Sequence, residues 1–157
     1  MPEIRTEIRA GDQISADYWP PAVQSDDGTV ISNITNTSYA AGSPEVGVAF
    51  VAPKTGRVGI AVCGGMREDS AGNRVFMTYE LFEGEDNTGV QILAPAGIHG
   101  ISTSGATVAT LDRALGALEM RQGLTPGTTY YARIMYLTEG GTTNDITRRR
   151  IIVFPLS

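Results

Sequence analysis

Apolar residues alternate with polar or small residues along most of the chain, in short runs that are separated by segments rich in Gly, Pro, Asp and Asn. A period of two places successive side chains on opposite faces of a strand, so each run predicts a strand with one buried face. In the clearest run, residues 130–137, the side chains on the expected core face are Tyr130, Ala132, Ile134 and Tyr136. Short strands with turns at this spacing predict an all-β fold.

The same pattern recurs from residue 29 to near the end of the chain. The expected strands are residues 29–39, 46–50, 58–62, 74–83, 90–93, 111–121, 130–137 and 146–154. Residues 52–56 supply Pro and Gly where a hairpin turn uses them, so we expect strands 46–50 and 58–62 to pair. The sequence Asp26-Asp27-Gly28 is expected as a turn ahead of the first strand.

Residues 111–121 admit two interpretations. Leu111, Leu115 and Leu118 lie near helical spacing. Leu118 and Met120 instead belong to an alternation typical of a strand. Gly116 and the all-β surroundings favour the strand.

Residues 123–130 combine turn chemistry with the entry to a strand. Pro126 fixes its own φ and favours the second position of a turn, and Gly127 can adopt φ > 0. The order Leu124-x-Pro126-Gly127-x-x-Tyr130 resembles the entry to the penultimate strand of fibronectin type III and related immunoglobulin-like sandwiches, where the tyrosine forms a tyrosine corner. The resemblance implies a buried Tyr130 whose hydroxyl bonds to backbone in the preceding turn, with Leu124 as the buried residue before that turn.

Residues 25–157 are therefore predicted to form an antiparallel β-sandwich, immunoglobulin-like, fibronectin III-like or jelly-roll in topology. Residues 1–24 read as an extended arm, because Pro20 and Pro21 stop any short helix and the segment is too small to build a core. Its apolar side chains need cover from a surface elsewhere, including another chain. The expected anchors of this arm are Ile4, Ile8, Ile14, Tyr18 and Trp19.

Several expected strands carry large side chains on both faces, whereas a sandwich buries one face of each sheet. The outward side chains would leave exposed apolar patches unless a neighbour covers them, so we expect self-association. The alternative is that scattered surface aromatics need no partner. The interface residues expected on this basis are Phe76, Phe82, Tyr131 and Met135, together with the basic run Arg148, Arg149 and Arg150. On a strand this run would place Arg149 on one face and the other two on the opposite face, with ion pairs to neighbouring acids.

Composition removes several classes of function. A formal net charge of −5 argues against nucleic acid as a partner, because such binding needs a clustered positive surface. The apolar runs are too short to cross a membrane, and the first residues lack the apolar core of a signal peptide, so we expect synthesis in the cytoplasm. Cys63 is the single cysteine, which excludes an intrachain disulfide.

No arrangement of residues indicates catalysis or a cofactor. His99 is the sole histidine, and one His with one Cys cannot supply the usual ligands of zinc. We interpret His99 as an ordinary loop residue and Cys63 as a small buried one, since neither has the partners that nucleophilic catalysis requires. The acids Glu83, Glu85 and Asp86 lack the spacing of a calcium loop. We expect no enzyme activity, no cofactor and no metal.

Four tracts together resemble small virion proteins of tailed bacteriophages, particularly those that infect high-GC actinobacteria. The tracts are residues 10–19 (AGDQISADYW), 48–58 (VAFVAPKTGRV), 123–131 (GLTPGTTYY) and 148–155 (RRRIIVFP). The resemblance implies a non-enzymatic component of the virion, in the tail tip, tail fibre or another minor tail position, that assembles through an N-terminal arm. It also implies a homo-oligomer, often a trimer, with other virion proteins as partners.

Two other functions stay open. One is a decoration protein on the phage head. The other is a carbohydrate-binding or receptor-binding module that stacks host surface glycans on exposed aromatics such as Tyr131 or Trp19. A binding module should gather solvent-facing aromatics in one groove, whereas a structural component should bury them between chains. A hydrolase would need convergent acids in a cleft.

Overall fold

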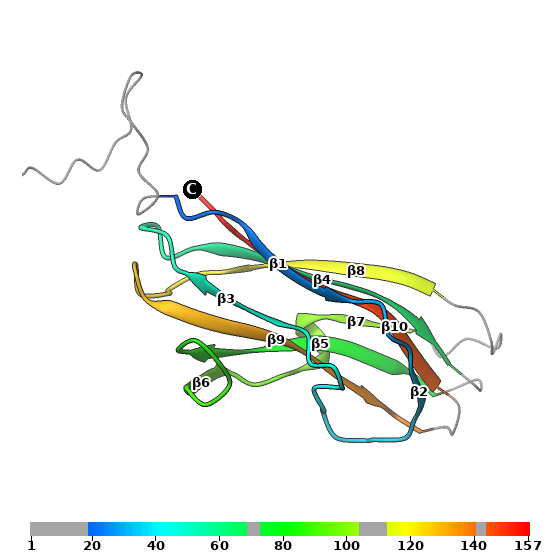
Figure 1. Cartoon of the computed structure of the whole chain (residues 1–157). Helices are drawn as coiled ribbons and strands as arrows, with labels where there is room; N and C mark the ends of the chain where they lie inside the picture. Colours follow the sequence, from blue (N-terminus) through cyan, green and yellow to red (C-terminus); the bar gives the residue numbers. More distant parts are fainter. Residues whose placement is uncertain (1–18, 69–72, 104–112, 141–143) are drawn as a thin grey trace, which may run out of the picture.

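Two antiparallel β-sheets face each other in the computed structural model of the protein (Figure 1). The structure describes residues 19–68, 73–103, 113–140 and 144–157. The predicted all-β, antiparallel sandwich is confirmed, with no α-helix among the described residues. Burial of the facing sides of the two sheets produces the core.

The first sheet has the strand order β1-β10-β4-β8, with β2 pairing to another part of β10. Its strands are β1 (Val23–Asp27), β2 (Ile31–Ile34), β4 (Val58–Arg67), β8 (Arg113–Arg121) and β10 (Asn144–Pro155). In Figure 1 β1, β4 and β8 form the upper layer, and β10 slopes down to the right, where it meets β2.

The second sheet has the order β3-β9-β5-β6, with the short β7 also pairing to β5. Its strands are β3 (Gly47–Val51), β5 (Val75–Glu83), β6 (Val90–Leu93), β7 (Ile101–Ser102) and β9 (Thr129–Thr138). One turn of 3₁₀ helix, η1 (Gly97–His99), leads into β7.

Alternating side chains from the two sheets fill the space between them. On β5 the inward residues Val75, Met77, Tyr79 and Leu81 are at most 1% exposed, as the period of two predicts. The largest inward apolar side chains from the other strands are Val58, Ile60, Val62, Met66, Ile134, Ile146 and Ile151. Full burial of such side chains contributes about 1.5–3 kcal/mol each.

The expected hairpin between residues 46–50 and 58–62 is wrong. Strand β3 pairs with β9 in the second sheet, whereas β4 lies between β10 and β8 in the first. The intervening Pro-Gly segment bonds instead to the turn before β9, since the Leu124 N–H donates to the carbonyl of Gly56. Gly56 has φ of 63°, and a Cβ there would lie 2.5 Å from the Leu124 carbonyl oxygen.

The start of the domain also differs from the prediction. The expected strand 29–39 is reduced to β2, and Asp26 with Asp27 ends β1 instead of forming a turn. These acids lie opposite Arg150 and Arg149 on β10, and the ion pairs favour a paired strand over the local turn tendency. Because β1 begins at Val23, the sheet begins two residues before the expected domain boundary at residue 25.

The preferred interpretation of residues 111–121 as a strand holds for residues 113–121, which form β8, and residues 111–112 lie outside the described residues. Its orientation was not predicted. Leu115 and Ala117 pack against the core, whereas Leu118 is 66% and Met120 is 56% exposed.

The turn before β9 has the geometry expected from its sequence. The Thr128 N–H donates to the Thr125 carbonyl at 3.1 Å, and Gly127 has φ of 77°, so Pro126 and Gly127 occupy the central positions of a type II turn. Tyr130 is 3% exposed, and its hydroxyl accepts a hydrogen bond from the Thr125 N–H at 3.0 Å. Leu124 is also buried. This contact ties the turn to the core, as a tyrosine corner does.

We predict that Tyr130→Phe lowers the free energy of unfolding by about 1–3 kcal/mol, because the Thr125 N–H loses its acceptor. Urea unfolding followed by circular dichroism measures the change. Tyr39→Phe is the control, because Tyr39 is half-buried and its hydroxyl makes no hydrogen bond within the described part of the chain. Equal stability of the Tyr130→Phe variant and the wild type would contradict a structural role for this hydroxyl.

Candidate functional site

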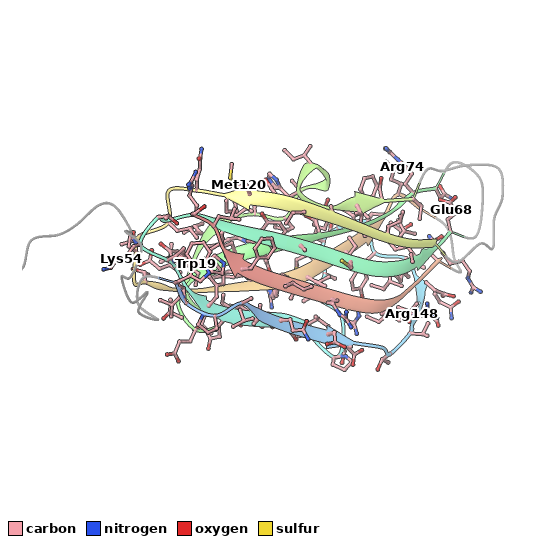
Figure 2. The ribbon with its side chains drawn as sticks, turned by 90° about the horizontal axis from the view of Figure 1, so that it is seen from above. Trp19, Lys54, Glu68, Arg74, Met120 and Arg148 are labelled. Atoms are coloured by element: carbon pink, nitrogen blue, oxygen red, sulfur yellow. The ribbon has the colours of Figure 1, made fainter. Side chains whose placement is uncertain are left out.

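The outer face of the first sheet is dominated by small and apolar residues. Ile60 and Val62 on β4 are buried in the core, so the alternate residues of that strand point outward. Their cross-strand partners on β8 and β10 point outward as well. The small and apolar members of this outer face are Gly59, Ala61, Cys63, Gly65, Ala114, Gly116, Leu118, Met120, Ile152 and Phe154. Figure 2 looks onto this face, with β8, β4, β10 and β1 side by side.

The two ends of this face differ in relief. At one end Leu118 and Met120 project from the edge strand β8, and the Phe154 ring lies against Gly59, where a Cβ would come within 2.4 Å of the ring. We call this the raised end. The other end is a shallow hollow, which we call the hollow end, lined by Cys63, Gly64, Gly65, Ala114, Leu115, Arg148, Arg150 and Ile152.

A bulge in β10 distributes the basic run at the hollow end. Arg148 and Arg149 together lie opposite Gly64, between the pairs Thr147–Gly65 and Arg150–Cys63. Arg148 takes the left-handed φ of 51° that such a bulge requires. The bulge places Arg149 inward, while its two neighbours face solvent, as the period of two predicted.

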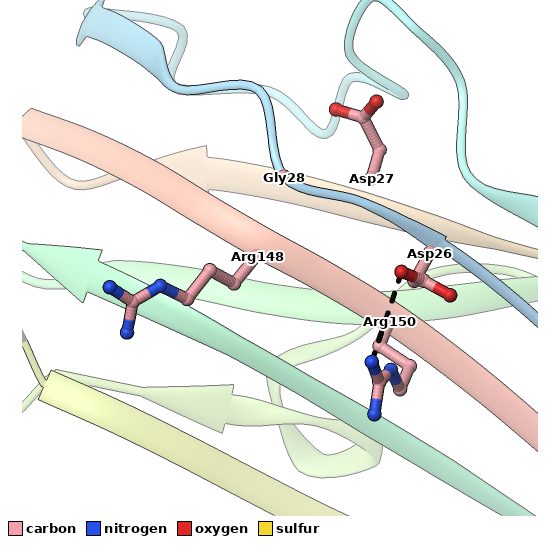
Figure 3. A pocket seen from close by; sticks show the side chains of 5 residues that line it. All are labelled: Asp26, Asp27, Gly28, Arg148 and Arg150. Atoms are coloured by element: carbon pink, nitrogen blue, oxygen red, sulfur yellow. Dashed lines mark ion pairs between the residues drawn. The ribbon is translucent and has the colours of Figure 1, made fainter.

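Two of the three arginines pair with acids of β1, as expected. Arg149 is 1% exposed, and its Nη2 donates to Asp27 Oδ1 at 2.7 Å while its Nη1 donates to the Pro44 carbonyl at 2.7 Å. Arg150 lies 3.8 Å from Asp26 in an exposed pair. Arg148 points away from both acids in the second hollow beside β1 (Figure 3) and makes no ion pair within the described residues.

The outer face of the second sheet is closed by the chain's own polar side chains. Arg133 bonds to Glu80 and to Glu45, each at 2.5 Å, and its guanidinium lies 5.5 Å from the centre of the Phe82 ring. The Tyr131 hydroxyl donates to Glu45 at 2.6 Å, and burial together with Glu45 raises the pKa of Tyr131.

The expected apolar patch on this sheet is therefore corrected. Phe82 and Met135 are only 6% and 7% exposed within a single chain. Phe76 is half-buried with the Arg74 guanidinium 4.9 Å above its ring, and Tyr131 is half-buried as well. Exposed apolar side chains lie instead on edge strands of both sheets, at Leu118 and Met120 on β8 and at Val90 and Ile92 on β6.

A polar cluster that the sequence did not reveal joins the two sheets beside η1. The Tyr79 hydroxyl donates to Glu119 at 2.8 Å and accepts from Arg121 Nε at 2.6 Å. His99 Nδ1 lies 3.1 Å from the Glu119 carboxylate and 2.9 Å from Arg121 Nη2. The sequence signal was the pair Glu119 and Arg121, which alternates with the apolar residues of β8 and occupies its inner face.

Burial raises the pKa of Tyr79, and the Glu119 carboxylate acts in the same direction, so the phenol stays protonated and donates. Tyr79, Glu119 and Arg121 each bond to another member of the cluster, and His99 Nδ1 either donates to Glu119 or accepts from Arg121. The arrangement therefore links β8 to β5, and it places His99, which was expected to be an ordinary loop residue, in a polar cluster beside η1.

The expected assembly arm is described only at its end. Trp19 is 38% exposed, and Ile4, Ile8, Ile14 and Tyr18 lie outside the described residues. Among the residues that the structure describes, no group of His, Cys, Asp and Glu side chains could hold a metal ion. Nor does any helix in this part of the chain have the length and apolarity to cross a bilayer.

No protein-family model and no curated protein matches the sequence. Solved structures do match the fold. The chain is similar to VP2 of infectious bursal disease virus in a subviral particle, with a TM-score of 0.55 and 11% identity over 98% of this chain and 36% of that one. A mutant VP2 of the same virus in T=1 particles gives a TM-score of 0.52 and 12% identity over 98% and 36% of the two chains.

The structure of the Gx strain of infectious bursal disease virus is similar over 86% of this chain and 32% of that one, with a TM-score of 0.51 and 11% identity. The described chain thus corresponds to about a third of the length of these proteins. At this identity the similarity shows a shared β-sandwich fold.

We predict that Asp27→Asn lowers the free energy of unfolding at neutral pH. The stability of the variant should also change less than that of the wild type as the pH falls from 7 to 3. Burial raises the pKa of Asp27, but hydrogen bonds from Thr29 and the Arg149 guanidinium outweigh it, so the pKa lies below its usual value. A lowered pKa in the folded state gives stability that is present above about pH 4 and is lost as the pH falls further. Urea midpoints from pH 3 to pH 7 measure the effect. Asp26→Asn, in the looser exposed pair with Arg150, is the matched control for the loss of one carboxylate from β1.

Proposed function

We propose that this protein is a non-enzymatic structural component of a virus particle. The observation that carries the proposal is the fold, which resembles VP2 of a virus particle over 98% of the chain. The exposed outer face of the first sheet supports it, because contiguous apolar faces on small domains mark sites of association.

Within a virion we assign the protein to a tailed bacteriophage, as a tail-tip, tail-fibre or minor tail component. The four sequence tracts that resemble such proteins support this assignment, together with the arm that precedes β1 at Val23.

Decoration of the phage head is the second candidate, since the VP2 neighbours come from structures described as a subviral particle and T=1 particles. The partners would be further copies of this chain and other virion proteins. The net charge of −5 disfavours nucleic acid as a partner.

A carbohydrate-binding module has less support. Sugar stacking needs exposed aromatic rings gathered in one groove, and Trp19 is the single aromatic among the large exposed apolar side chains of the described residues. Tyr131, the other candidate ring, is half-buried and bonded to Glu45.

The arm is predicted to be needed for assembly and not for folding. Because β1 begins at Val23, a deletion of residues 1–18 leaves both sheets intact, whereas the arm as first delimited, residues 1–24, would remove part of β1. We expect the truncated protein to keep its β circular dichroism spectrum and to be lost from particles in an incorporation assay. The control replaces residues 1–18 by a Gly/Ser segment of equal length. Normal incorporation of the truncated protein, or its failure to fold, would contradict an assembly role for the arm.

We predict that His99→Ala leaves incorporation into particles unchanged. The imidazole contributes to the cluster between β8 and β5, so the variant should lose about 0.5–1.5 kcal/mol of stability, as for one hydrogen bond. Thermal unfolding and the incorporation assay measure the two effects. A reaction catalysed by the wild type and abolished in a folded His99→Ala protein would overturn the non-enzymatic proposal.

A further inference from the structure

The outer face of the first sheet has a relief that fits a reversed copy of itself. Along β8 the outward residues change from large to small, from Met120 and Leu118 at the raised end to Gly116 and Ala114 at the hollow end. Turning a second copy by half a turn about an axis that lies in the face, perpendicular to the strands, brings each raised end over a hollow end. Met120 of one copy then lies over Ala114 of the other, and Leu118 over Gly116.

We infer that two copies of this chain associate face to face through this surface, with their strands running in opposite directions. The inference deepens the proposed function and rests on it for its biological setting, because it names one of the contacts by which a structural component would assemble. Two aligned sheets packing through their faces is an established mode of β-sheet association.

The distribution of charge favours the reversed arrangement over the parallel one. Arg148 and Arg150 both lie at the hollow end, and Arg148 makes no ion pair within the described residues. Parallel stacking would bring the arginines of both copies together at one end, which costs free energy through like-charge repulsion. Reversed stacking separates them and places Arg148 near the Phe154 ring of the other copy, within reach of a cation–π contact.

The size of the face is sufficient for a specific contact. Strands β1, β4, β8 and β10 have 5, 10, 9 and 12 residues, and these 36 residues, at a rise of about 3.3 Å and a spacing of about 4.8 Å, cover roughly 600 Å². Two copies would therefore bury roughly 1,200 Å² in total, at the lower end of the range for specific interfaces. On the second sheet Arg133, Glu80 and Glu45 cover the outer face, and the exposed Val90 and Ile92 are confined to the edge strand β6.

The first test measures the molar mass of the purified full-length protein by sedimentation equilibrium across a range of concentrations. We expect a dimer. Leu118→Lys at the raised end and Ala114→Lys at the hollow end should each weaken it by about tenfold or more, because each buries an unpaired charge. Val90→Lys is the matched control, since Val90 is 71% exposed on β6 of the second sheet. Circular dichroism verifies that each variant is folded.

The second test distinguishes reversed from parallel stacking by cross-linking. In a Cys63→Ser background, Met120→Cys and Ala114→Cys proteins are mixed and treated with a short bis-maleimide. Reversed stacking places β8 over β8 and predicts cross-links between 120 and 114. Parallel stacking is a half turn about an axis along the strands, which places β8 of one copy over the opposite edge strand β1 of the other, so it predicts no cross-link between 120 and 114.

Three results would overturn the inference. They are a monomer at all concentrations, a trimer that Leu118→Lys does not affect, and a dimer that gives no cross-link between 120 and 114. Each of them leaves the arm-deletion experiment unaffected, because that experiment tests incorporation into particles. Failure of the proposed function and failure of this contact are thus distinguishable.

Discussion

One bulge in β10 fixes the arrangement of the first sheet. The apolar residues of this strand change phase, because Ile146 is buried at an even position while Ile151 and Val153 are buried at odd positions. A regular strand would turn one of these groups to solvent, since a slip of one residue moves every side chain to the other face. Arg148 and Arg149 both lie opposite Gly64, and this extra residue changes the phase of the strand. Arg148 adopts a left-handed φ there, which destabilises the backbone by about 1–2 kcal/mol.

The same bulge explains the electrostatics along β1. It sends Arg149 into the interior, where burial of a guanidinium is costly without acceptors, and Asp27 together with the Pro44 carbonyl provides them. Asp27 can serve only if β1 joins the sheet next to β10. The ion pair, the position of β1 and the burial of both ends of β10 are therefore coupled.

Local chemistry predicted some elements of the fold, and contacts distant in sequence decided the rest. The turn at Pro126–Gly127 and the burial of Tyr130 depend on residues within one short tract, so the sequence was sufficient. The pairing of β3 with β9 depends on chain segments about 80 residues apart, and no turn sequence at residues 52–56 could reveal it. The orientation of β8 could not be predicted, because its inner face carries Glu119 and Arg121, whose partners Tyr79 and His99 come from β5 and η1.

Contacts distant in sequence also cover the large outward residues of the second sheet, and this cover distinguishes the two outer faces. Large outward residues such as Phe82 suggested an exposed patch, but Arg133 lies over that ring and is itself held by Glu80 and Glu45. Among the described residues no such side chain covers the small residues of the first sheet, and β8, which carries the exposed Leu118 and Met120, is the last strand in the order of that sheet. An apolar face next to an open edge is a liability for a free monomer. The exposed arginines lie at only one end of the face, so parallel stacking would bring like charges together and is disfavoured. The reversed pair then remains as the arrangement that covers the apolar face and protects it from other contacts.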